Sequence, residues 1–427
     1  MRPIRTDVGG AMLSCITTDK FKCEYISLLF TLPLAQEAVQ ANTLLIPILC
    51  RGTERHPSKR EINLHLDDLY STSISVQNHR IGDMQQIGLT AHFPGGRFVG
   101  GGGILSDVLE TMADLLYRPL LRGGRFCEDF VENEKAVLRD DIRAAINNPR
   151  SYAKAGCRKL LCAGEPYALR LDGEEETLSA VSAQSMTAHY QTFISSAVPT
   201  FFYVGSASVD EVKAAIAAHF PKFSAQRNAF SSILKRCDGA PKRVEEEMPV
   251  SQGKIAIGFR TELSIKDRDK AKALAVMNEI YGASPASKLF LNVRERQSLC
   301  YHCGSTLSLF KGVMFVGAGM TPENREVTEN AILSEFADMQ GGRISDTELL
   351  AAKRSLDLAC RQALDSPGAL SAFYGRRALV DIDETLEQYR EAIAQVTKDD
   401  VVDVANRVQC GAVFFLKGTL TGAEVEE

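Results

Sequence analysis

The sequence lacks any excess of positive charge and any long apolar segment. Its 49 lysines and arginines stand against 54 aspartates and glutamates, which gives a formal net charge of −5. A chain without a basic stripe has no electrostatic means of holding nucleic acid or an anionic membrane, so we expect neither as a partner. The longest apolar run near the start, residues 44–50, contains Pro47 and is too short to span a bilayer. Because no apolar stretch of a signal peptide precedes it, we expect a cytoplasmic protein.

The cysteines do not form the pattern of a disulfide framework. There are 11 of them, an odd number scattered from Cys15 to Cys410 in apolar surroundings, which predicts reduced thiols. One pair, Cys300 and Cys303, has the spacing of a redox pair or of half a zinc site, but no second such pair could complete four ligands. Residues 299–309 predict a strand, on which positions three apart face opposite sides. The two sulfur atoms are therefore expected to diverge.

The sequence offers little support for an independent catalytic site. It contains no Gly-x-Ser-x-Gly elbow, the mark of many serine hydrolases. His65 and Asp68 share a predicted helix face at a spacing that suits a metal ion. With His79 and His92 on other elements they could form a zinc site; the alternative is a solvated helix face and unrelated strand histidines.

The order of predicted elements occurs twice along the chain. In each occurrence a strand is followed by helices, by two strands, by two further helices, and finally by a strand that ends at glycine. The first runs from the strand at 25–32 to the strand at 201–205, and the second from 254–260 to 413–418. A length of 427 residues also predicts at least two domains. We infer an internal duplication with an α+β plan, divided into residues 1–225, a polar linker at 226–245, and residues 246–427.

Four segments carry a resemblance to a known family. They are Gly52-Thr53 after an apolar helix, Gly-Glu-Pro-Tyr at 164–167, Gly-Glu-Glu-Glu-Thr-Leu at 173–178, and Arg-Glu-Arg-Gln-Ser-Leu-Cys-Tyr at 294–301. In this order and spacing the chain resembles the pitrilysin/insulinase family of zinc peptidases over nearly its whole length. The resemblance implies two homologous halves, each a mainly antiparallel sheet faced by helices, which enclose a peptide chamber.

The zinc motif of that family is missing here. Active members carry His-x-x-Glu-His, in which the histidines bind zinc and the glutamate activates a zinc-bound water. With Gly52-Thr53 as the anchor, these positions fall on Thr43, Ile46 and Pro47, and the first histidine of the chain, His56, follows the anchor. The later glutamate ligand corresponds to Asp141, a lone carboxylate that could not hold the metal. The resemblance therefore implies a chain that binds no metal and is inactive alone.

A second set of family residues is kept. Arg294 and Tyr301 match an arginine and a tyrosine that, in the family, donate hydrogen bonds to the substrate and to the developing oxyanion; Arg296 is the alternative match for the arginine. The resemblance implies a homologous partner that supplies zinc and base, and a peptide substrate; whether the chain forms a homodimer when the partner is absent stays open. Three other hypotheses stay open: a pure scaffold, a peptide-binding module without catalysis, and a stand-alone hydrolase with a non-standard site.

Overall fold

The computed structural model describes residues 1–100 and 103–420, which form two compact units. Unit 1 comprises residues 1–143, 169–231 and 363–385, and unit 2 comprises residues 144–168, 232–362 and the chain from 386 onward. Each unit therefore includes a short segment from a distant part of the chain. The division into halves at 226–245 stays a prediction about the duplication, because the compact units are a different partition. No helix in the described ranges is long and apolar enough to cross a bilayer.

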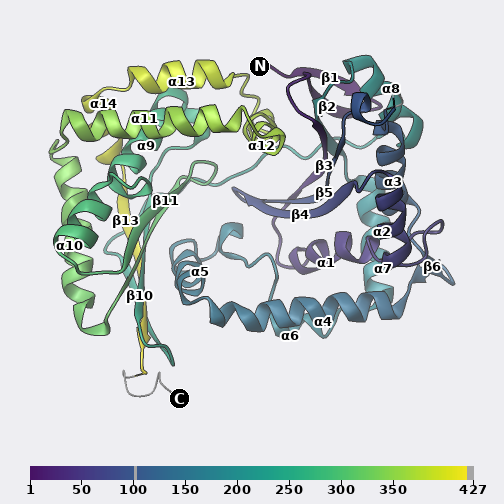
Figure 1. Ribbon diagram of the computed structural model, residues 1–427. Coiled ribbons are helices and arrows are strands. Elements are labelled where there is room, and N and C mark those ends of the chain that lie inside the picture. The colour runs from purple at the N-terminus through teal and green to yellow at the C-terminus, as the bar shows by residue number, and fades with distance from the viewer. Residues whose placement is uncertain (101–102, 421–427) are drawn as a thin grey trace. The chain divides into compact units, whose positions relative to one another are not determined.

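Unit 1 is built on a six-stranded sheet. Its strands are β1 (Ile4–Val8), β2 (Ala11–Thr17), β3 (Cys23–Pro33), β4 (Ser73–Ile81), β5 (Met84–Pro94) and β8 (Pro199–Gly205). Their order is β1-β2-β8-β3-β5-β4, and β2 and β8 form the parallel pair of an otherwise antiparallel sheet. Figure 1 shows β3, β4 and β5 side by side, with β4 at the edge.

The helices of unit 1 cover both faces of this sheet. They are α1 (Val39–Leu49), α2 (Lys59–Asp68), α3 (Leu105–Tyr117), α4 (Glu128–Ala144), α6 (Glu175–Leu178), α7 (Ala183–Ser196), α8 (Val209–His219) and α12 (Pro367–Ala378). Alternate residues of β3, Ile26, Leu28 and Phe30, pack into the core with α1, α3 and α7. The opposite face lies under α12, where Ser27 and Ser371 bring their hydroxyls to 3.3 Å. Period-two burial of this kind follows from the pleat of a strand.

Unit 2 repeats this sheet with one strand fewer. Its strands are β9 (Lys242–Met248), β10 (Gly253–Arg260), β11 (His302–Ser308), β12 (Val313–Met320) and β13 (Gln409–Gly418), in the order β11-β12-β10-β13-β9. Here β9 and β13 are the parallel pair. This order matches β4-β5-β3-β8-β2 of unit 1, strand for strand. The predicted α+β class, with two sheet-bearing halves of one plan, is confirmed.

The sheet of unit 2 is also covered on both faces (Figure 1). The helices are α5 (Pro149–Leu161), α9 (Arg268–Asn278), α10 (Arg325–Gln340), α11 (Asp346–Ala363), α13 (Leu386–Gln395), α14 (Lys398–Ala405) and the π-helical segment η6 (Leu289–Arg296). On one face α9, α10 and α14 share an apolar core with the sheet. On the other, α5 packs so closely that a Cβ on Gly156 would lie 2.6 Å from the Phe414 ring. A glycine at this position is what lets the helix approach the strand.

Candidate functional site

Helix α1 carries the positions at which the resemblance expects a zinc motif. Thr43 and Pro47 are half-buried, whereas Ile46 is only 1% exposed and belongs to the apolar core of unit 1. Pro47 lies inside the helix and has no N–H to donate to the carbonyl of Thr43. Neither an isoleucine nor a proline side chain has a lone pair that could bind a metal ion or take up a proton.

The hydroxyl of Thr43 is the centre of a hydrogen-bond network. Its O–H lies within donating distance of the carbonyl oxygens of Val39 and Leu171. Its oxygen accepts from the side-chain amides of Asn78 at 2.9 Å and Gln85 at 3.1 Å. The Gln85 amide is fully buried, and its NH₂ also lies 3.0 Å from Asn78 Oδ1. Buried amides paired in this way lock their neighbours in place, because an unmatched amide would lose its hydration without compensation.

The network continues along the same helix. Asn42 donates to Gln85 at 3.1 Å and lies 2.9 Å from the ring nitrogen of His189. Gln40 donates to the carbonyls of Asp172 and Glu174 and accepts from Thr177 at 2.9 Å. Thr43, Asn42, Asn78, Gln85 and His189, named here the α1 network, therefore fill this region with uncharged groups. Burial lowers the pKa of His189, which favours its neutral form.

Asp141 does not complete a metal site with these residues. It lies exposed on α4, while Glu134, on the same helix, is ion-paired with Arg51 just beyond α1. Near the end of α4, Arg143 pairs with Glu175 at 2.5 Å. The side chains at Thr43, Ile46, Pro47 and Asp141 thus do not fit a zinc ion, and no chemistry is assigned to a metal in this chain.

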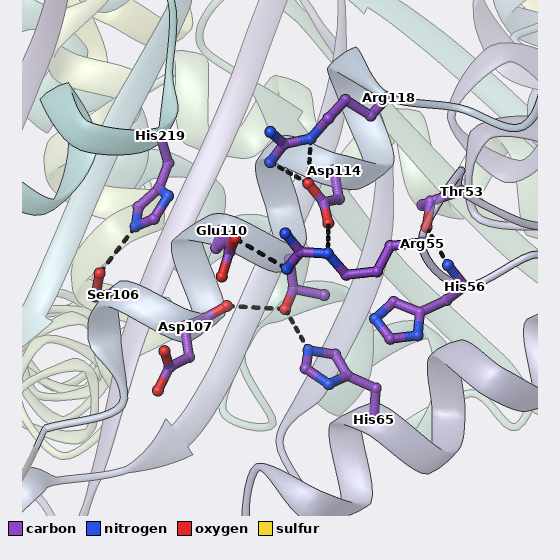
Figure 2. A network of polar contacts seen from close by, with 11 residues as sticks. Thr53, Arg55, His56, His65, Ser106, Asp107, Glu110, Asp114, Arg118 and His219 are labelled. Atoms are coloured by element: carbon purple, nitrogen blue, oxygen red, sulfur yellow. Dashed lines mark hydrogen bonds and ion pairs between the residues drawn. The ribbon is translucent and has the colours of Figure 1, made fainter.

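The Gly52-Thr53 pair after α1 has a structural role. A Cβ on Gly52 would lie 2.7 Å from the carbonyl oxygen of Pro57, so only glycine allows this approach. Thr53 accepts from the backbone of His56 at 2.9 Å, and Arg55 binds Glu110 at 2.9 Å and Asp114 at 3.6 Å. Figure 2 shows Arg55 and Arg118 converging on Asp114 of α3, with the Thr53–His56 contact to one side. These contacts hold the loop that follows α1 against α3.

The histidines considered for a relocated zinc site have other partners. His65 stacks on His56 with ring centroids 4.5 Å apart and lies 3.0 Å from the Thr111 hydroxyl (Figure 2). His79 pairs with Gln77 at 2.8 Å, and His92 packs edge-on against a tyrosine. Within residues 1–100 and 103–420, no three histidine, cysteine or acidic side chains lie close enough together to hold a metal ion. The structure does not bring His65 together with His79 and His92.

Arg294 and Tyr301 lie in unit 2, at the start of β11. Arg294 is on η6, packs its guanidinium 4.6 Å from the centre of the Phe290 ring and pairs with Glu295 at 3.4 Å. It also acts electrostatically on Cys300 and His302, the two neighbours of Tyr301. Tyr301 is 62% exposed and is held by its backbone N–H, which donates to Gly319 at 2.8 Å. The fold thus brings the arginine and the tyrosine segment together and presents the phenol to the outside.

The expectation for Cys300 and Cys303 is wrong. The strand begins at His302 rather than before Cys300, because Ser298 adopts a left-handed backbone conformation with φ of 52°. The two buried thiols hydrogen-bond to each other instead of diverging. This hydrogen bond, with help from the Arg294 guanidinium, lowers the pKa of Cys300, while the pKa of Cys303 is raised. All eleven cysteines are free thiols.

Comparison with known proteins assigns the fold. Residues 180–356 match the family described as the Peptidase M16 inactive domain. This stretch, less than half of the chain, is similar to an M16 peptidase domain. The chain is 29% identical over 419 residues to a Bacillus subtilis protein described as the probable inactive metalloprotease YmfF, with 97% of this chain and 98% of that protein covered. The resemblance to a zinc peptidase family, in the form that lacks the motif, is confirmed.

Two solved structures share the M16-type fold over the whole chain. A conserved protein from Enterococcus faecalis has a TM-score of 0.89 at 23% identity, covering 99% of this chain and 100% of that one. A peptidase M16 inactive domain from Pseudomonas fluorescens has a TM-score of 0.80 at 18% identity, with 99% of both chains covered. This chain is thus metalloprotease-like and similar to the inactive members of the M16 family.

Several polar residues of this M16-type chain were not anticipated from the sequence. The α1 network had a visible signal, since Asn42 and Gln85 interrupt otherwise apolar segments, but their pairing depends on the sheet register. Arg150 and Lys154 lie one helical turn apart on α5, and Lys254 lies on β10. Their proximity could not be predicted, because α5 and β10 are about a hundred residues apart in the chain.

Proposed function

We propose that this chain is the non-catalytic subunit of a two-chain zinc peptidase of the cytoplasm. A homologous partner would supply the zinc ion and the general base. This chain would supply Arg294 and Tyr301 as hydrogen-bond donors to the peptide and to the oxyanion of the tetrahedral intermediate. Donors of this kind accelerate acyl transfer when they are held in place before charge develops.

The observation that carries the proposal is the contrast between the two candidate sites. Uncharged hydrogen-bonding groups and an apolar side chain occupy the motif positions on α1, whereas Tyr301 is 62% exposed and follows Cys300, on which the Arg294 charge acts. A tyrosine exposed to this degree buries little apolar surface and contributes little to folding. Its presence is better accounted for by a ligand or partner that the pair meets.

The proposed substrate is a short, extended peptide. Each sheet ends on an antiparallel edge strand, β4 in unit 1 and β11 in unit 2. An edge strand can pair with an added peptide strand through backbone hydrogen bonds, which select conformation more than side chains. We therefore expect a partner complex that is tolerant of sequence and selective for extended segments.

The test uses this chain mixed with its zinc-bearing homologue and a fluorogenic peptide. Tyr301→Phe removes only the phenol hydroxyl, and Arg294→Gln removes the guanidinium with its charge while keeping a polar side chain. Each variant is expected to lower kcat about 100-fold with little change in KM, because a donor aimed at the oxyanion is worth about 3 kcal/mol. Binding of the two chains should be unchanged in size-exclusion chromatography.

The rival hypotheses predict other outcomes. A pure scaffold would leave the turnover of both variants at the wild-type level. A peptide-binding module would bind peptide without the partner, and no mixture would turn it over. A homodimer of this chain that hydrolyses peptide by itself would favour the stand-alone hydrolase and refute the proposal.

A further inference from the structure

A hollow lies on one face of the sheet of unit 2, beside the start of β11. Its volume is about 170 Å³, and it is lined by residues of α5, β10, β11 and β12. Glycines form the floor: Gly304 and Gly317 are cross-strand partners, and Gly317 is open, with no atom within 4 Å of where its Cβ would be. Missing side chains on adjacent strands leave room for a ligand to approach the backbone.

Cationic side chains surround this floor. Arg150 and Lys154 reach it from the first turns of α5, and Lys254 reaches it from β10. Lys254 is the cross-strand partner of Gly319, which is in turn the partner of His302. A Cβ on Gly319 would lie 2.9 Å from the Lys254 ammonium, so this cation leans over the glycine row. Arg150, Lys154 and Lys254, named here the cationic hollow, thus converge from two elements, and Arg150 and Lys254 also act electrostatically on His302 of β11.

The lysines of the cationic hollow donate hydrogen bonds to neutral side chains, which do not neutralise their charges. Lys154 donates to the Thr306 hydroxyl at 2.8 Å, and Lys254 donates to the Gln252 amide at 2.6 Å, both neutral acceptors. No acidic residue is among the described side chains that line the hollow. Burial and the nearby Arg150 lower the pKa of both lysines. The N-terminal end of α5 adds a further positive potential.

We propose that the cationic hollow binds a carboxylate of the peptide substrate. The assignment rests on the proposed function for the peptide nature of the ligand, and on the hollow itself for the charge. A compact anion would replace the hydration of three cations at once, with its body over the glycine floor. The hollow lies on the strand that follows Tyr301, so a peptide held by the donors would place a carboxylate within its reach. The substrate class is therefore peptides that present a carboxylate to the hollow, either from an acidic side chain or from the C-terminus.

Calorimetry on the full-length chain can test this with four N-acetylated Ala-Ser heptapeptides. They differ in the central residue, Asp or Asn, and in the C-terminus, carboxylate or amide. At least one carboxylate peptide is expected to bind ten-fold or more tightly than the neutral Asn amide. Which one does so distinguishes a side-chain carboxylate from a terminal one.

Variants then locate the binding. Lys254→Gln should weaken the preferred peptide about ten-fold, and Gly317→Leu should do the same by filling open space without changing any charge. Lys398→Gln, an exposed lysine on α14, is the matched control and should leave the affinity unchanged. A circular-dichroism melt of Gly317→Leu checks that the variant is folded.

Three outcomes would overturn the proposal: equal binding of charged and neutral peptides, no effect of either variant, or binding of inorganic phosphate with no peptide binding at all. These are separable from the proposed function. Loss of carboxylate preference with full turnover by the mixed pair refutes only the cationic hollow. Carboxylate-dependent binding with no turnover in any mixture refutes only the composite site.

Discussion

The α1 network of unit 1 and the start of β11 in unit 2 differ in charge and in exposure. In unit 1 an amide network and a buried isoleucine occupy the positions of a zinc motif, and the interactions there are short, neutral and satisfied. In unit 2 Tyr301 is exposed, and the two lysines of the cationic hollow donate to neutral acceptors. Satisfied neutral networks stabilise a fold, whereas clustered like charges cost stability. The α1 network is therefore neutral and satisfied, whereas the region of β11 combines an exposed tyrosine with clustered cations.

The largest effect is expected from putting the motif back. Ile46→Glu places a carboxylate at a position that is 1% exposed, and it should lower the free energy of unfolding by about 3 kcal/mol or more. Urea denaturation followed by circular dichroism measures this. Ile46→Leu, which conserves volume, is the control and should cost less than about 1.5 kcal/mol.

The contrast between the two regions would be wrong if restoring the His-x-x-Glu-His motif on α1 were enough to restore zinc binding. The combined variant Thr43→His, Ile46→Glu and Pro47→His is expected to be poorly folded and to contain no stoichiometric zinc. A stable triple variant with one zinc ion per chain would show that unit 1 still has the geometry of a metal site.

A smaller loss is expected from the α1 network itself. Gln85→Ala removes the buried amide that joins Asn42, Thr43 and Asn78, so the Asn42 NH₂ group and Asn78 Oδ1 lose the bonds they make to it. The free energy of unfolding should fall by about 2 kcal/mol. Gln184→Ala, at an exposed position of α7, is the matched control. If both substitutions lower the free energy of unfolding by the same few tenths of a kcal/mol, the network does not stabilise unit 1.

The smallest effect distinguishes the two regions by their response to salt. Burial is the main cause that lowers the pKa of both His189 and His302, and the cations Arg150, Arg294 and Lys254 lower that of His302 further. Salt screens exposed charges but does not reverse burial. In NMR titrations at high salt, the pKa of His302 should therefore rise toward its ordinary value while that of His189 stays. Equal changes in the pKa of His302 and His189 would mean that the cations of the hollow exert no particular electrostatic potential on His302.

The sign of the pH effect follows from these lowered values. Above about pH 6.5 both histidines are neutral in the folded and the unfolded chain, so their contribution to stability is constant. As the pH falls below that value, the unfolded chain binds protons first, and the free energy of unfolding decreases until the folded-state pKa is reached. His302→Gln should make this decrease less steep.

The sequence was sufficient for the repeated order of elements because each strand and helix has a clear local pattern. Ser58, a residue type favoured at helix N-caps, caps α2: its hydroxyl accepts from the backbone of Glu61 at 3.3 Å. The start of β11 was placed too early, because a serine at 298 gives no local sign of a positive φ. The cationic hollow could not be predicted, since it depends on α5 lying against β10 and β12. Local chemistry is visible in a sequence, whereas contacts between distant segments are not.

The most direct test of the composite site is the zinc content and peptidase activity of this chain, alone and mixed with a zinc-bearing homologue. We expect no bound zinc and no turnover for the purified chain, and zinc-dependent turnover on mixing that exceeds the activity of the homologue alone. One zinc ion per chain, or turnover by the isolated chain, would contradict it.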